Sequence, residues 1–123
     1  MSKILIAEDD LFLGKIAVKK LEKENFEVNF LISGETVLEQ AKLFKPDAIV
    51  LDLIMPEKDG FEALVELKSE SLTKDIPVII LTALSSPEDQ EKVKKIGAEH
   101  FFIKSDIELS DLTAYLHKLV DTK

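Results

Sequence analysis

The sequence predicts one α/β domain built around a parallel β-sheet. Four short apolar runs alternate with segments of helical periodicity, and each run ends at a polar residue: residues 4–7 before Glu8, 48–51 before Asp52, 78–81 before Thr82, and 101–103 before Lys104. Such runs are typical of strands buried on both faces of a parallel sheet. Because ligands bind outside the carboxyl ends of such strands, the four polar residues are expected at one sheet edge. The 123 residues suffice for a single domain.

The first half of the chain is expected to contain two helices between three strands. Asp9 or Asp10 can cap the first helix. Its expected buried face consists of apolar residues at helical spacing: Leu13, Ile16, Ala17 and Leu21. The second strand is expected over residues 28–32, after which Ser33 and Gly34 open the second helix. The apolar side of that helix is expected at Val37, Leu38, Ala41 and Phe44.

The second half is expected to contain three helices. A loop over residues 55–60 ends in an Asp-Gly turn. The third helix then has its apolar side at Phe61, Leu64, Val65 and Leu67. Ser-Pro-Glu-Asp over residues 86–89 is typical of a helix start. The fourth helix has few apolar anchors, chiefly Val93 and Ile96, before Gly97 ends it, so we expect it to open or shift easily. The last helix carries a clear stripe: Leu109, Leu112, Leu116 and Leu119.

The composition of the chain argues against several classes of function. The formal net charge of −8 argues against direct nucleic-acid binding, which requires clustered cations. All 16 basic residues are lysine, so the chain cannot hold a phosphate with a bidentate guanidinium group. No apolar stretch is long enough to span a membrane, and no signal-peptide pattern precedes the first strand. Cysteine is absent, which excludes disulfides and thiolate-bound zinc. A cytoplasmic location without membrane contact is therefore expected.

The acids at the strand ends suggest a divalent cation site. Glu8 and Asp9 are adjacent, and Asp52 follows a strand that is expected to be a neighbour. Crowded carboxylates raise one another's pKa unless a cation compensates. Mg²⁺ suits a site of one or two carboxylates, waters and a phosphate oxygen. The simpler reading is that the acids cap the first helix; we favour it for Asp10, whereas for Asp9 both roles are compatible.

Asp52 is the candidate nucleophile because it directly follows four apolar residues. A carboxylate beside a metal can attack a phosphoryl donor and form an aspartyl phosphate. Lys104 would supply positive charge to the phosphoryl oxygens, and Thr82 a hydroxyl donor. A threonine or lysine at a strand end is more often structural, but the four residue types together point to phosphoryl chemistry.

Several ordered segments resemble the receiver domain of two-component response regulators: residues 4–10, residues 49–56 with 59–60, residues 76–83, and residues 97–98 leading to Lys104. The resemblance covers essentially the whole chain. It implies a flavodoxin-like fold of five parallel strands in the order 2-1-3-4-5, which is the order of the chemotaxis receiver, with helices on both faces. Residues 1–123 would form one receiver domain with no output domain.

The resemblance also implies residue roles. Asp52 would accept the phosphoryl group from a sensor histidine kinase or phosphotransfer protein, and Thr82 and Lys104 would contact that group. Asp9 would bind Mg²⁺ directly, with Glu8 assisting through water. The full set of metal ligands would be Glu8, Asp9, Asp52 and the backbone carbonyl of Ile54. The protein would be a signalling switch that promotes its own phosphorylation and dephosphorylation, and not a turnover enzyme.

The implied switch couples the site to a surface. Thr82 would move toward the phosphoryl oxygen, and Phe101, three residues before Lys104, would rotate inward. The surface formed by the fourth helix, fifth strand and fifth helix would then bind a downstream protein or a second receiver. Phe101 could equally be a plain core aromatic.

Two departures from the family pattern have consequences. The family usually has a proline after its lysine, often with a cis peptide bond, and this chain has Ser105. A non-proline cis bond costs about 3 kcal/mol, so we expect a trans bond or visible strain. Ile54 and Leu84 lie two residues beyond Asp52 and Thr82, where the family modulates phosphoryl hydrolysis. Neither side chain can orient a water molecule, so we expect slow loss of the phosphoryl group.

Three other functions fit the sequence less well. A haloacid-dehalogenase-type phosphohydrolase would need a second acid where Ile54 stands, and a cap domain. A receiver-like binding module that no longer accepts phosphate is disfavoured because all five site residues are present. A phosphotransfer role for His117 would require a helical bundle, so exposed surface positions are expected for His117 and His100.

Overall fold

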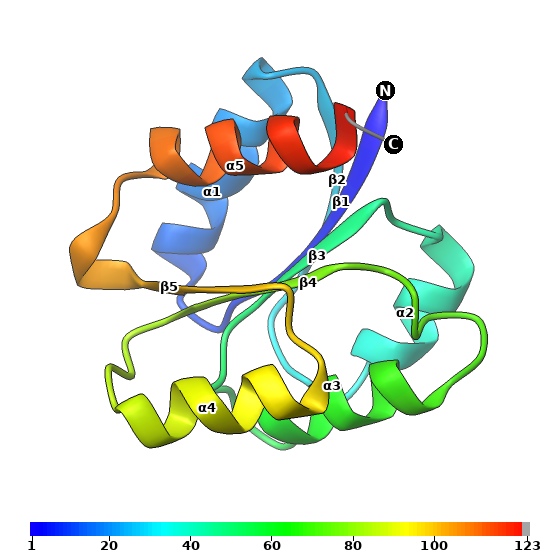
Figure 1. Cartoon of the computed structure of the whole chain (residues 1–123). Coiled ribbons are helices and arrows are strands. Elements are labelled where there is room, and N and C mark those ends of the chain that lie inside the picture. Colours follow the sequence, from blue (N-terminus) through cyan, green and yellow to red (C-terminus); the bar gives the residue numbers. More distant parts are fainter. Residues whose placement is uncertain (122–123) are drawn as a thin grey trace.

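The computed structural model of the chain describes residues 1–121, which form a five-stranded parallel sheet between two layers of helices (Figure 1). Strands and helices alternate: β1 (Ser2–Ala7), α1 (Leu11–Lys23), β2 (Phe26–Leu31), α2 (Val37–Phe44), β3 (Ala48–Leu51), α3 (Gly60–Ser69), β4 (Val78–Thr82), α4 (Pro87–Ile96), β5 (His100–Ile103), the short 3-10 helix η1 (Lys104–Asp106) and α5 (Leu109–Asp121). The strand order is β2-β1-β3-β4-β5, and all neighbours are parallel. The fold and strand order expected from the sequence are confirmed.

The helices divide between the two faces of the sheet. α2, α3 and α4 cover one face, and α1 and α5 cover the other (Figure 1). β3 and β4 lie in the middle and contain only buried residues, as their uninterrupted apolar sequences predict. No helix within residues 1–121 combines the length and the apolar character needed to cross a membrane.

Side-chain caps and one glycine determine where several helices begin and end. Asp10, Asp59 and Ser86 cap α1, α3 and α4 through oxygens that accept backbone N–H bonds from the first helical turn. Of the two acids expected to cap the first helix, Asp10 is therefore the cap. Gly97 ends α4 with φ of 128°, a backbone conformation that favours glycine. These helix boundaries agree with the signals in the sequence.

Two apolar residues lie outside the faces predicted for them. Ile16 of α1 and Val65 of α3 are 40% and 47% exposed. Each occupies the margin of its apolar stripe, and the sheet covers only the centre of that stripe, where Ala17 and Leu64 are buried. Helical periodicity alone does not reveal how wide the covered stripe is.

The second strand and second helix also differ from the predicted bounds. β2 begins at Phe26 and not at residue 28, because its pairing with β1 starts at Ser2, which lies opposite Phe26. The Phe26 side chain is buried. Ile32 follows the strand and is exposed. α2 begins at Val37, since residues 33–36 form bends and turns.

The structure predicts that α4 opens more readily than the other long helices. Within α4 one residue, Val93, is buried, whereas α5 buries Leu112, Thr113, Leu116 and Val120. Because local opening exposes less apolar surface in α4, its amide hydrogens should exchange on the order of tenfold faster than those of α5. Hydrogen–deuterium exchange with residue resolution measures this, and α5 serves as the internal control. Equal protection of the two helices would contradict the prediction.

Candidate active site

The carboxyl ends of the central strands bring the predicted residues together. β1 and β3 are paired so that Ala7 faces Leu51, and the next residues, Glu8 and Asp52, therefore stand side by side. The backbone N–H of Asp52 donates to the carbonyl oxygen of Ala7 at 3.1 Å, which continues the ladder beyond the strands. Both acid positions are thus determined by the sheet itself and not by a mobile loop.

Lys104 connects two of the acids. Its Nζ lies 2.7 Å from Oε1 of Glu8 and 2.8 Å from Oδ2 of Asp52. Burial alone would lower the pKa of Lys104, but hydrogen bonds to Asp52 and Glu8 outweigh it, and the pKa lies above its usual value. Lys104 is therefore a permanent positive charge at the sheet edge.

Glu8, Asp9 and Asp52 form an acid cluster in which oxygens of the three carboxylates lie within 4.8 Å of one another. Glu8 and Asp52 are only 3% and 4% exposed, whereas Asp9 faces solvent. Burial raises the pKa of Glu8; hydrogen bonds from Lys104 and from the Asp10 backbone offset this only in part, and the charge of Asp52 raises it further. When ionised, three carboxylates and one ammonium leave two negative charges unbalanced. This charge and the oxygen donors fit a divalent hard cation such as Mg²⁺.

Hydrogen bonds to both oxygens orient the carboxylate of Asp52. Oδ2 accepts from Lys104, and Oδ1 accepts the backbone N–H of Ile54 at 3.2 Å. Below it, Gly60 packs so closely that a Cβ there would lie 2.1 Å from the carbonyl oxygen of Asp52 and 2.6 Å from Cα of Leu53. The sequence identified Gly60 only as part of a turn. Its Asp-Gly pair indicated a tight loop but not this contact with Asp52.

Thr82 ends β4, the strand between β3 and β5. Its side chain is fully buried, and its hydroxyl accepts the backbone N–H of Leu84 at 3.4 Å. The hydroxyl hydrogen remains available as a donor, because a hydroxyl can donate and accept at the same time.

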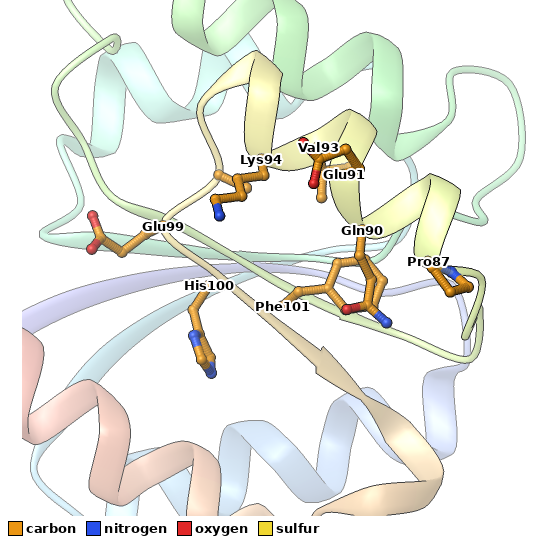
Figure 2. A pocket seen from close by; sticks show the side chains of 9 residues that line it. Pro87, Gln90, Glu91, Val93, Lys94, Glu99, His100 and Phe101 are labelled. Carbon is orange, nitrogen blue, oxygen red and sulfur yellow. The ribbon is translucent and has the colours of Figure 1, made fainter.

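Phe101 lies on β5 and contributes to the packing beneath α4. Its partly buried side chain joins the core cluster that contains Val93, and it extends from β5 toward the start of α4 (Figure 2). A cavity of about 530 Å³ lies between α4 and β5, with Pro87, Gln90, Val93, Lys94, His100 and Phe101 among its lining residues. Phe101 therefore forms part of the wall of an open groove between α4 and β5.

The segment after Lys104 adopts a regular conformation without proline. Lys104, Ser105 and Asp106 form η1, and no peptide bond within residues 1–121 is cis. The expected trans bond between Lys104 and Ser105 is confirmed. The lysine still reaches both acids, so proline is not required to direct its side chain toward the site.

Neither histidine contacts the acid cluster. His100 is exposed, as expected, and its ring stacks on Tyr115 with centroids 4.7 Å apart. His117 is only partly exposed: its Nε2 lies 3.1 Å from Oε1 of Glu24, and its ring lies 4.6 Å from that of Phe26. Both histidines therefore take part in surface packing between secondary-structure elements.

The family model of the response regulator receiver domain matches residues 4–117. The chain belongs to this family. Receiver domains are phosphorylation-dependent signalling switches of two-component systems; they bind Mg²⁺ at an acidic pocket and interact with histidine kinases or phosphotransfer proteins. In this chain the acid cluster and Lys104 lie together at the carboxyl ends of β1, β3 and β5.

Relatives and solved structures are consistent with this assignment. The chain is 35% identical over 102 residues to the probable transcriptional regulator ycf27 of Cyanophora paradoxa, covering 83% of the chain and 41% of that protein. It is 32% identical over 111 residues to the transcriptional regulatory protein PdtaR of Mycobacterium tuberculosis, covering 89% and 52%. The chain thus spans about half or less of the length of these relatives.

Two receiver domain structures superimpose over nearly the whole chain. The receiver domain of the Francisella response regulator 1452 has a TM-score of 0.91 at 28% identity and covers 100% of both chains. The BeF3-activated receiver domain of RstA from Klebsiella pneumoniae has a TM-score of 0.88 at 27% identity and covers 97% and 98%. The fold is therefore shared beyond the residues of the site.

Replacing Gly60 tests how closely the β3–α3 loop supports Asp52. In Gly60→Ala the new methyl group meets backbone atoms that cannot rotate away. We expect the free energy of unfolding to fall by about 2 kcal/mol or more. Urea denaturation measures the change, and Glu62→Ala, an exposed position on the same helix, should stay within about 0.5 kcal/mol of the unmodified protein. If Gly60→Ala left the free energy of unfolding unchanged, this would show that the loop can move away from Asp52.

Proposed function

We propose that this receiver domain accepts a phosphoryl group on Asp52 from the phosphohistidine of a sensor kinase or phosphotransfer protein. The observation that carries the proposal is the buried carboxylate of Asp52, held between Lys104 and the backbone of Ile54 beside two further acids. An acid with a purely structural role does not require this surplus of negative charge around it. A phosphoacceptor that works with a bound cation requires such a surplus to hold the cation.

The transfer itself requires little covalent chemistry from the protein. An oxygen of Asp52 bonds to phosphorus while the bond between phosphorus and the donor nitrogen breaks, and the electron pair remains on the donor imidazole. Lys104 already forms an ion pair with Asp52, and its ammonium group would bind the phosphoryl oxygens once they are transferred. The hydroxyl of Thr82 would donate to one of those oxygens. Positioning and charge neutralisation are the main contributions.

Glu8, Asp9, Asp52 and the backbone carbonyl of Ile54 are the proposed Mg²⁺ ligands. When bound, the cation would neutralise charge on the phosphoryl oxygens. Both carboxylate oxygens of Glu8 have protein partners, Lys104 and the Asp10 N–H, whereas the Asp9 carboxylate has no hydrogen bond or ion pair within residues 1–121. This difference supports direct binding by Asp9 and an assisting role for Glu8 through water.

The proposed output passes through Thr82 and Phe101. Movement of Thr82 toward the phosphoryl group would leave room for Phe101 to turn inward, and the surface of α4, β5 and α5 would change its shape. The light anchoring of α4 supports this path. We propose that the altered face binds a downstream protein or a second receiver, in the cytoplasm, without direct contact to nucleic acid or membrane. No output domain is proposed within the 123 residues.

Acetyl phosphate with Mg²⁺ provides a test that needs no cognate kinase. We expect intact-protein mass spectrometry to show one added phosphoryl group, and none for Asp52→Asn or in the presence of EDTA. No addition to the unmodified protein would favour a receiver-like binding module instead. Repeated turnover of a phosphate ester by the purified protein would favour a phosphohydrolase and would contradict the proposal.

The phosphoryl group on Asp52 should be long-lived. The side chains of Ile54, half exposed at the site, and Leu84, partly buried against the α4 side of the core, cannot hydrogen-bond a water molecule. We expect a half-life far longer than seconds, measured as loss of radiolabelled phosphate with Mg²⁺ present. Ile54→Asn, whose amide can hold a water molecule, should shorten it on the order of tenfold.

Val65→Asn is the matched control for the lifetime prediction, because it places the same amide on an exposed position of α3 outside the acid cluster. It should leave the half-life unchanged. A half-life of seconds in the unmodified protein would overturn the expectation.

A further inference from the structure

Gly14 and Phe30 make an unusually close contact between α1 and β2. A Cβ built on Gly14 would lie 2.2 Å from Cζ and 2.5 Å from Cε1 of Phe30, so the edge of the ring occupies the space of a side chain at position 14. Gly14 is buried at the end of the first turn of α1, where glycine costs about 1 kcal/mol relative to alanine. The contact with Phe30 is a physical reason for glycine at this position.

This contact closes one end of the segment that carries the acids. At the other end, the backbone N–H of Glu8 donates to the carbonyl oxygen of Leu31 at 2.9 Å. Phe30 and Leu31 are consecutive residues of β2. The two ends of residues 8–14 therefore contact neighbouring residues of the same strand. The segment is therefore a short loop and helical turn clamped by β2.

Within the clamp, hydrogen bonds connect Gly14 to Asp10 and Asp10 to Glu8. The N–H of Gly14 donates to the carbonyl oxygen of Asp10 at 2.8 Å, the first backbone bond of α1. The side chain of Asp10 caps the first turn, and its N–H donates to Oε2 of Glu8 at 3.1 Å. Asp9 lies between these bonded residues, and its own carboxylate has no hydrogen bond or ion pair within residues 1–121. The backbone alone therefore places Asp9.

We propose that Gly14 and Phe30 are positioning residues for Asp9, and that their contact sets the Mg²⁺ affinity of the site. The proposal rests on the proposed function, in which Asp9 binds Mg²⁺ directly. A side chain at position 14 takes the place of the Phe30 ring edge, so the ring must swing away and no longer packs against the first turn of α1. That turn then loses its contact with β2, and Asp9 is no longer held beside Glu8 and Asp52. Loss of the ring of Phe30 releases the same turn.

The test uses Gly14→Ala, Phe30→Leu and the double variant in the full chain. Isothermal titration calorimetry with MgCl₂ measures the Mg²⁺ dissociation constant. Calorimetry is the method of choice because the protein has no tryptophan whose fluorescence could report binding. We expect Gly14→Ala to weaken Mg²⁺ binding by about tenfold and Phe30→Leu by several-fold. In the double variant the alanine methyl fills the space left by the ring, and the dissociation constant should return to within about twofold of the unmodified protein.

A second readout needs no metal. In the metal-free protein, the backbone amide NMR shifts of residues 8–13 should change in Gly14→Ala and return in the double variant. Ala17→Gly, also buried in α1, is the control for stability. It should lower the melting temperature while leaving the Mg²⁺ dissociation constant within about twofold.

The outcomes separate the two proposals. If the unmodified protein binds Mg²⁺ and is phosphorylated, but Gly14→Ala binds Mg²⁺ equally well or the double variant does not recover, the positioning role is wrong and the proposed function stands. If Gly14→Ala does not fold, Phe30→Leu decides: unchanged Mg²⁺ binding overturns the inference. If the unmodified protein binds no Mg²⁺, the proposed function itself fails.

Discussion

The ion pairs of Lys104 with Glu8 and Asp52 are the interaction on which the site depends. Two nearly buried carboxylates on adjacent strands repel each other and lose hydration, and one ammonium within 2.8 Å of both offsets part of that cost. Strand order makes this contact possible, because Lys104 follows β5 and must reach past the end of β4 to the ends of β3 and β1. Thr82 ends β4, the strand between them, and is fully buried.

The type and order of the secondary-structure elements, and the set of residues at the sheet edge, were predictable from the sequence because they follow from local patterns. Apolar runs locate strands, caps locate helix starts, and parallel strands bring their carboxyl ends to one edge. Contacts between segments distant in sequence were not predictable. The approach of Gly60 to Asp52 and of Gly14 to Phe30 depends on how closely two elements pack, and the exposure of Ile16 and Val65 depends on how wide a stripe the sheet covers. No periodicity within one element encodes these distances.

The two helices that precede and follow β5 differ in how firmly they are anchored. α5 is anchored by four buried residues, whereas α4 is anchored by one and rests beside a cavity. Phe101 belongs to β5, and Lys104 directly follows that strand in η1. In the proposed switch, a change of partner at Lys104 would therefore act on the end of the strand that carries the aromatic side chain beneath α4. Site and surface would then be coupled without a long chain of intermediate contacts.

The exposed and buried acids differ in what holds them, which matches the different roles proposed for them. Glu8 and Asp52 are held by the sheet ladder and by Lys104, so their oxygens are already committed to protein partners. Within residues 1–121 the Asp9 carboxylate has no partner, and it faces solvent, so in the proposed site it would be the first carboxylate that an arriving cation meets. An acid without partners of its own can be placed only by its backbone. If the backbone at Asp9 is held through α1 by the edge strand β2, as we propose, the strand most distant from Lys104 in the sheet determines where this proposed ligand stands.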